Sequence, residues 1–218
     1  MPWRKRADPE PDEPEGPILR RATERVASQV APFLLEAVPS IEIVVGDRHT
    51  ALRGLVACYR AERTELSHRF GLLAERDGDV AGIAIAFPGR LYQSLKLGTG
   101  VTLARAAGPR HAAEVVRRER VLARLLPRVE PDFLYVSTVA VAEGHRRQGV
   151  ARALMSRVVS GAERMGLGIA LDTAMDNEPA RALYEGFGLR VVAARETKAL
   201  DRKLIPVPGM LRLERPRA

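Results

Sequence analysis

The residues with the clearest chemical purpose lie where a predicted strand runs into a predicted helix. The stretch 133–141 (FLYVSTVAV) is rich in β-branched and aromatic residues, which favour strands. The segment 146–151 (RRQGVA) then opens an amphipathic helix. The first N–H groups of a helix lack partners inside it and carry partial positive charge, so they bind anions. With Arg146 and Arg147 beside the small Gly149, this turn predicts a pyrophosphate site.

The turn is neither of two common nucleotide-binding motifs, but it does resemble a third. It lacks the Gly-Lys-Ser/Thr of a Walker A loop and the three-glycine spacing of the dinucleotide fingerprint. Residues 146–151 match the Arg/Gln-x-x-Gly-x-Gly/Ala hallmark of the GNAT superfamily of N-acetyltransferases, and residues 139–141 match its preceding Val-x-Val strand. Asn177 and residues 182–189 (ALYEGFGL) resemble that family's Asn-x-x-Ala-x-x-Leu-Tyr-x-x-x-Gly-Phe, although a leucine replaces the final aromatic residue.

The resemblance covers about residues 130–213, and the earlier part fits only in the order of its elements. It implies acetyl-CoA as the cosubstrate. The backbone of residues 139–141 would pair with the pantetheine arm as an added strand, and the N–H groups of residues 147–152 would hold the pyrophosphate. Asn177 would bond to the pantetheine region, and Tyr184 would lie near the thioester sulfur. The implied CoA-binding residues are Val139, Ala140, Val141, Arg146, Arg147, Gln148, Gly149, Val150, Ala151, Arg152, Asn177 and Tyr184.

The implied reaction is direct attack of a neutral amine, from a small molecule or a peptide, on the acetyl thioester. Tyr184 would protonate the departing thiolate as a general acid, and the N–H near Val141 would stabilise the oxyanion. The general base is open. Glu143, just past the strand, is one candidate, and Ser137 or Tyr135 positioning a water is another.

Each of these residues also has a structural interpretation. Tyr184 can serve as a packing residue, Asn177 as a helix cap, and Glu143 as a solvated turn residue. Arg146 and Arg147 can be surface charge alone. Two functions from other classes therefore stay open. One is a non-catalytic, regulatory CoA-binding module on the same fold, and the other is a nucleic-acid binder.

The surrounding elements predict one α/β domain over residues 18–218, with a mixed, mostly antiparallel sheet flanked by helices. Residues 1–17 are acidic and rich in proline, which predicts a disordered leader. The expected strands are 18–20, 70–75, 80–87, 133–141, 167–173, 190–197 and 210–213, the second and third forming a hairpin at Asp77-Gly78. The expected helices are 22–38 with a kink or break at Pro32, 48–66 capped by Asp47, 90–126 with breaks at Gly98, Gly100 and Gly108-Pro109, 150–165, and a short one from Asn177 to Glu185.

The composition narrows the choice of partners. The chain has 218 residues, a net charge of +8 and one cysteine. The basic balance alone raises nucleic acid, a membrane surface or a polyanionic small molecule. No zinc finger, RNP motif or helix-turn-helix signature is present, and no apolar run is long enough for a membrane span. Cys58 and the four histidines lack metal-ligand spacing. We therefore expect a cytoplasmic protein without metal, nucleic acid or membrane partners. A homodimer is plausible for the resembled family.

Residues 88–131 separate two strands that a short hairpin would join in compact members of that family. Here the chain resembles puromycin N-acetyltransferase and its relatives, which also carry helices at this place. The segment should form one wall of the acceptor pocket, with Leu91, Tyr92, Leu95 and the His111 region as candidate lining residues. The net charge of residues 101–130 is +4, which favours a neutral, apolar or anionic acceptor.

Overall fold

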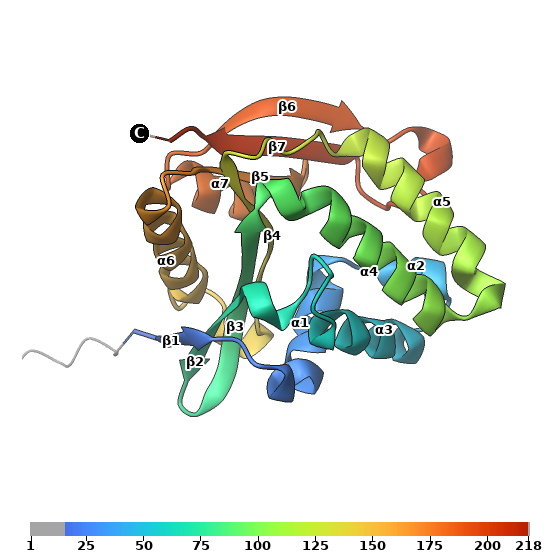
Figure 1. Ribbon diagram of the computed structural model, residues 1–218, viewed down its shortest axis with the longest axis horizontal. Coiled ribbons are helices and arrows are strands. Elements are labelled where there is room, and N and C mark those ends of the chain that lie inside the picture. The colour runs from blue at the N-terminus through green and yellow to red at the C-terminus, as the bar shows by residue number, and fades with distance from the viewer. Residues whose placement is uncertain (1–15, 218) are drawn as a thin grey trace, which may run out of the picture.

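The computed structural model describes residues 16–217, and its centre is a seven-stranded sheet in the order β1-β2-β3-β4-β5-β7-β6 (Figure 1). Neighbouring strands are antiparallel except for β4 and β5, which are parallel. The predicted mixed, mostly antiparallel sheet is therefore confirmed. Residues 1–15 of the predicted leader lie outside the described part of the chain. The strands are β1 Ile18–Arg21, β2 Gly71–Arg76, β3 Asp79–Pro88, β4 Phe133–Val141, β5 Gly168–Ala174, β6 Arg190–Glu196 and β7 Gly209–Arg215.

Helices cover both faces of this sheet. One face packs against α6, while α1 lies against β3 and β4 on the other, with α2 to α5 gathered beyond it (Figure 1). The α-helices are α1 Ala27–Ala37, α2 Ser40–Val45, α3 Arg48–Arg60, α4 Tyr92–Ala107, α5 Pro109–Leu125, α6 Val150–Arg164 and α7 Glu178–Glu185. Short 3-10 turns occupy Glu24–Val26, His68–Phe70, Gly89–Leu91, Glu143–His145 and Ala199–Asp201.

The core divides along β3, where successive side chains point to opposite faces. Ile83 and Ile85 are fully buried on the face covered by α1 and α3, whereas Ala84 packs with α6. Gly82 allows the beginning of α6 to lie close to the sheet, because an added Cβ there would lie 3.0 Å from the Val150 side chain. Small residues on one face thus set the position of the α6 N-terminus relative to β4.

Local signals in the sequence predict most element boundaries. Asp77 and Gly78 both adopt positive φ (55° and 85°), as the hairpin between β2 and β3 requires. The Asp47 side chain accepts a hydrogen bond from the N–H of Thr50 (2.8 Å) and so caps α3 as expected. The breaks at Gly108-Pro109 and at Asn177 are also confirmed.

The helices differ from the prediction in four places. Helix α1 continues through Pro32 without a break, and α3 ends at Arg60 instead of Leu66. The short α2 was not expected. Helix α4 runs without interruption through Gly98 and Gly100. Gly98 serves for close packing, since an added Cβ would lie 1.8 Å from the Arg63 carbonyl oxygen.

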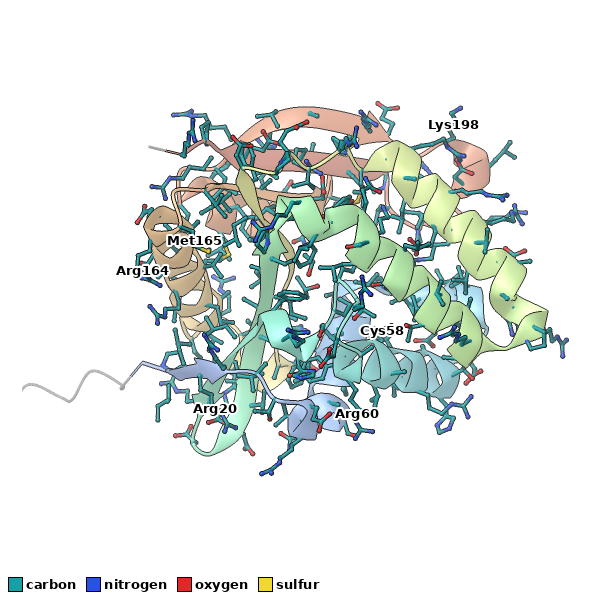
Figure 2. All side chains as sticks on the ribbon, viewed as in Figure 1. Arg20, Cys58, Arg60, Arg164, Met165 and Lys198 are labelled. Atoms are coloured by element: carbon teal, nitrogen blue, oxygen red, sulfur yellow. The ribbon has the colours of Figure 1, made fainter. Side chains whose placement is uncertain are left out.

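Charged side chains mark the outside of the molecule. Arg20, Arg60, Arg164 and Lys198 are exposed at its periphery, whereas Cys58 is buried among the helices around α3 (Figure 2). The sulfur of Cys58 therefore belongs to the core, as its apolar surroundings in the sequence indicate. Over residues 16–217, no helix combines the length and apolar character that crossing a bilayer requires.

Candidate active site

The parallel strands β4 and β5 pair over only part of their length. Their paired residues run from Phe133 and Gly168 to Val136 and Leu171, and within residues 16–217 no pair follows, although β4 continues to Val141. A bulge lies at this point, because the partner on β4 shifts from Thr138 to Val136 between consecutive residues of β3. The two strands therefore separate and leave the later half of β4 with an open edge.

The turn after β4 contains two residues in the left-handed conformation. Arg147 and Gly149 adopt positive φ (63° and 78°), and no atom lies within 4 Å of a Cβ built on Gly149. A left-handed residue beside a right-handed one turns successive N–H groups toward one point, where they can bind an anion. The N–H of Ala153 bonds to the Gly149 carbonyl oxygen (2.9 Å), so the N–H groups before it are those that a helix leaves without an internal partner. Arg146 forms an ion pair with Glu36.

A cavity of about 270 Å³ lies where β4 and β5 separate. Its walls come from β4, β5 and α7 on one side, and from the α1–α2 junction, α4, α5 and the segment before β7 on the other. Most of these side chains are aliphatic. Its polar and ionisable side chains are Ser40, Glu65, Thr99, Arg118, Tyr135, Ser137, Thr138, Asp172, Thr173, Asn177 and Tyr184.

Tyr184 and Asn177 both line this cavity, because residues seven positions apart lie on one face of a helix. Tyr184 is buried, and burial raises the pKa of its hydroxyl to about 12. The phenol therefore keeps its proton at neutral pH. The Asn177 side chain accepts a hydrogen bond from the N–H of Ala180 (3.3 Å) and caps α7. Its cap role does not prevent it from lining the cavity.

Glu65, which follows α3, is a cavity residue that sequence reasoning missed. Burial, together with the nearby carboxylates of Glu119 and Asp172 and against the opposing effect of Lys96 and Arg118, raises the pKa of its carboxyl group to about 7. A carboxyl group with this pKa exchanges a proton near neutral pH, as a general base must. Glu65 lies in an irregular segment, outside any motif, so no local pattern distinguishes it from other glutamates.

A buried ion pair holds the sheet together beside the cavity. Arg212 on β7 donates to both carboxylate oxygens of Asp172 on β5 (2.9 and 2.8 Å) and to the Pro127 carbonyl oxygen (2.8 Å). The Tyr135 hydroxyl on β4 donates to the same carboxylate (2.9 Å). Asp172 is the first residue of β5 beyond its last pair with β4. The network therefore ties β4, β5 and β7 together at the point where the first two separate.

Comparison with known proteins identifies this arrangement. The model of the acetyltransferase (GNAT) family matches residues 46–189, which is more than half of the chain. The chain belongs to the GNAT family of acetyltransferases. Members of this family transfer an acetyl group from acetyl-CoA. None of the curated protein sequences matches the chain.

Solved GNAT structures share the fold at low sequence identity. An N-acetyltransferase from Staphylococcus aureus Mu50 has a TM-score of 0.68 at 17% identity, over 91% of this chain and 100% of that one. The structure named histone acetyltransferase HPA2 and related acetyltransferase, from Corynebacterium glutamicum, has a TM-score of 0.60 at 18% identity, over 94% and 98%. A Bacillus subtilis acetyltransferase in complex with CoA gives 0.52 at 16%, over 92% and 97%. Because the sequence identities are low, these similarities show that the fold is shared and do not identify a substrate.

The three candidates for the proton acceptor of this GNAT chain differ in position. Glu143 is exposed on the turn before α6 and is not among the residues that line the cavity. Ser137 and Tyr135 line it, but both hydroxyls already donate within the protein, to the carbonyl oxygen of Glu65 (2.8 Å) and to Asp172 (2.9 Å). Glu65 is the further carboxylate that the fold adds to this set.

The side chains between β3 and β4 that the sequence offers as candidates to line an acceptor pocket do not line this cavity. Tyr92 and Leu95 are buried in a cluster with Tyr135, and Leu91 packs against it. The His111 ring lies against Gly46. Other side chains of the same segment line the cavity instead, because α4 and α5 turn different faces toward it: Thr99, Leu103, Arg118, Leu122 and Leu126.

A metal centre is not evident in the described chain. Among residues 16–217, no three His, Cys, Asp or Glu side chains are grouped so that they could hold an ion.

Proposed function

We propose that this chain transfers the acetyl group of acetyl-CoA to an amine nitrogen of a small molecule or peptide. One observation carries the proposal. Directly beyond the last β4–β5 pair, residues 137–139 and 172–174 line a cavity that Tyr184 also lines. From this cavity β4 continues to the turn before α6, so one open strand edge connects the cavity with the turn that we propose as the anion site.

The residues of this path fit the parts of a CoA thioester. The free edge from Val139 to Val141 can pair with the amide groups of a pantetheine arm. The N–H groups of residues 147–152 and the left-handed Gly149 suit a pyrophosphate. Asn177 lines the cavity beside this edge and would bond to the pantetheine region. When bound, acetyl-CoA supplies an activated acetyl group with a thiolate as the leaving group.

Tyr184 would act at the leaving sulfur. A thiol has an ordinary pKa of about 8.5, whereas the pKa of the Tyr184 hydroxyl is about 12. Complete proton transfer from the phenol alone would therefore be unfavourable. The hydroxyl instead donates a hydrogen bond that stabilises charge developing on sulfur, and passes on a proton as the acceptor nitrogen releases one. The N–H groups at the open edge near Val141 would stabilise the oxyanion.

Tyr184→Phe tests this role. We expect kcat to fall about 100-fold, because the leaving thiolate loses its donor, while the Kd for CoA changes little. Thiol release from acetyl-CoA over a panel of amines measures the rate. Tyr59→Phe is the matched control, since the Tyr59 hydroxyl is also buried and lacks a partner in the described chain but does not line the cavity.

The competing function is a non-catalytic CoA-binding module on the same fold. It predicts that CoA binds but that no amine in the panel accelerates thiol release, with Tyr184→Phe behaving like the unaltered protein. That outcome would remove the enzymatic proposal. A buried phenol and a titratable Glu65 in the same cavity favour the enzyme, since a binding module needs neither.

A further inference from the structure

Among the ionisable side chains that line the cavity in residues 16–217, the carboxylate of Glu65 has no ion-pair partner. In residues 16–217, no lysine, arginine or histidine nitrogen lies within 4.0 Å of its carboxylate. The other charged side chains that line the cavity, Asp172 and Arg118, each form an ion pair. Asp172 is paired with Arg212 (2.8 Å), and Arg118 is paired with Glu119 (2.5 Å). Arg118 also donates to the Ser40 hydroxyl (3.0 Å).

The backbone of Glu65 is fixed from two sides. Its N–H donates to the Thr99 hydroxyl on α4 (3.0 Å), and its carbonyl oxygen accepts from the Ser137 hydroxyl on the β4 bulge (2.8 Å). Gly98 allows α4 to approach this segment closely, with a built Cβ only 1.8 Å from the Arg63 carbonyl oxygen. The backbone of Glu65 is thus held beside the place where β4 and β5 separate, and the residue lines the cavity there.

The electrostatic surroundings keep this carboxyl group titratable near neutral pH. Burial raises its pKa, Glu119 on α5 and Asp172 on β5 act in the same direction, and the net value is about 7. Arg118 on α5 and Lys96 on α4 act against them. At pH 7 the group can therefore hold a charge that attracts a cation and can also accept a proton from it.

Most of the other residues that line the cavity with Glu65 are aliphatic. Among its described lining residues, Arg118 is the one cation, and it is already paired. Six of the seven arginines that make residues 101–130 basic are exposed and do not line the cavity. The net charge of that segment is therefore a poor guide to the acceptor. The aliphatic lining residues are Ala37, Val38, Pro39, Ile41, Leu66, Leu103, Leu122, Leu126, Val136, Val139, Ala174, Ala180, Ile205, Pro206, Val207 and Met210.

We propose that the acceptor is a primary alkylamine on an uncharged, largely apolar body, and that Glu65 binds its ammonium group and takes its proton. This inference rests on the proposed acetyl transfer. It names the residue that deprotonates the attacking amine, and it states which charge the acceptor carries. An acceptor that also carried a carboxylate would place a second anion beside Glu65, with no free cation among the described lining residues to receive it.

The proton balance of the step follows. Glu65 takes one proton from the ammonium group, and the freed nitrogen lone pair forms the C–N bond to the acetyl carbon. The C–S bond breaks as its electron pair leaves on sulfur. A second N–H proton goes to that sulfur through the Tyr184 hydroxyl, and Glu65 releases its proton to solvent. The products are one secondary amide, one free thiol and one proton.

Glu65→Gln tests the proposal, because glutamine keeps the size of the side chain but neither binds a cation strongly nor accepts a proton. We expect kcat/KM for 2-phenylethylamine to fall at least about 100-fold at pH 7, with KM for acetyl-CoA changed less than about 3-fold. The unaltered protein should show a rising limb in its pH–rate profile near pH 7. That limb should be absent in Glu65→Gln and present in Glu65→Asp, which restores a carboxylate.

Glu62→Gln is the matched control. Glu62 lies three positions away, its side chain is 71% exposed and it pairs with Arg69. It should retain the full rate and the limb near pH 7. Phenylalanine, which adds a carboxylate to the body of 2-phenylethylamine, should react at least about 10-fold more slowly.

The outcomes separate this inference from the proposed function. If amines react and Glu65→Gln keeps both rate and limb, the inference is wrong and acetyl transfer stands. The same holds if Glu143→Gln, rather than Glu65→Gln, removes the limb. Equal rates for phenylalanine and 2-phenylethylamine would overturn the acceptor class. If CoA binds but no amine reacts, the proposed function fails and the inference with it.

Discussion

At the scale of single residues, the proposed chemistry depends on Tyr184 and Glu65, which line the same cavity. Tyr184 lies within a motif, so its type and spacing predict its place in the cavity. Glu65 follows α3 in a segment with no motif, and its significance comes from contacts with α4 and β4 that are distant in sequence. Local patterns can predict the first kind of residue. The second kind becomes visible only when the fold brings its neighbours together.

The raised pKa of Glu65 also predicts a pH dependence of stability. The folded-state pKa of about 7 exceeds the ordinary value of 4.5, so the folded protein binds more protons between these pH values than the unfolded chain does. Stability should therefore fall as pH rises through this window, and the loss should be complete above pH 7. Glu65→Gln removes this contribution.

We expect Glu65→Gln to be more stable than the unaltered protein by about 1–3 kcal/mol at pH 8, and to differ little from it near pH 4.5. Urea unfolding at both pH values measures the difference, and other carboxyl groups cancel because both proteins carry them. A difference of equal size at the two pH values would show that Glu65 does not titrate as proposed.

At the scale of elements, the proposed pyrophosphate site depends on the backbone conformation at the start of α6. Gly149 before it and Gly166 after it both adopt positive φ (78° and 64°), and neither has an atom within 4 Å of a built Cβ. Alanine at either position should destabilise the fold by about 1 kcal/mol, because a Cβ is strained in this conformation. The two glycines thus form a matched pair at opposite ends of one helix.

Gly149→Ala should weaken CoA binding at least about 10-fold, since it strains the turn that aims N–H groups at the pyrophosphate. Gly166→Ala should leave the Kd unchanged. Titration calorimetry with CoA measures both. Equal affinities for the two variants would mean that the α6 N-terminus does not hold the cosubstrate.

The elements that carry motifs are also those that the sequence predicts well. The bounds of β4 match the prediction, and α6 and α7 begin where Gly149 and Asn177 indicate. The helices between β3 and β4 were less predictable. Glycine ordinarily weakens a helix, but in α4 it permits contact with the segment that carries Glu65. Tertiary packing overrides local preference there, and this is the region that shapes the acceptor side of the cavity.

At the scale of the whole molecule, the net charge of +8 is a weaker guide than the position of a few groups. Most of the arginines of α5 are exposed, whereas Arg118 and Arg212 are buried in ion pairs. The groups with a proposed role in binding a polyanion are the backbone donors and arginines at the start of α6. The charge inside the cavity that lacks a partner is negative, which is why a cationic acceptor is favoured.

The most direct test of this account is the product stoichiometry with acetyl-CoA and 2-phenylethylamine. Mass spectrometry measures the acetylated amine, and a thiol assay measures free CoA in the same reaction. The account predicts one N-acetylated amine for each thiol released, at a rate that depends on both Tyr184 and Glu65. Thiol release without acetylated amine, or no release while CoA binds, would contradict it.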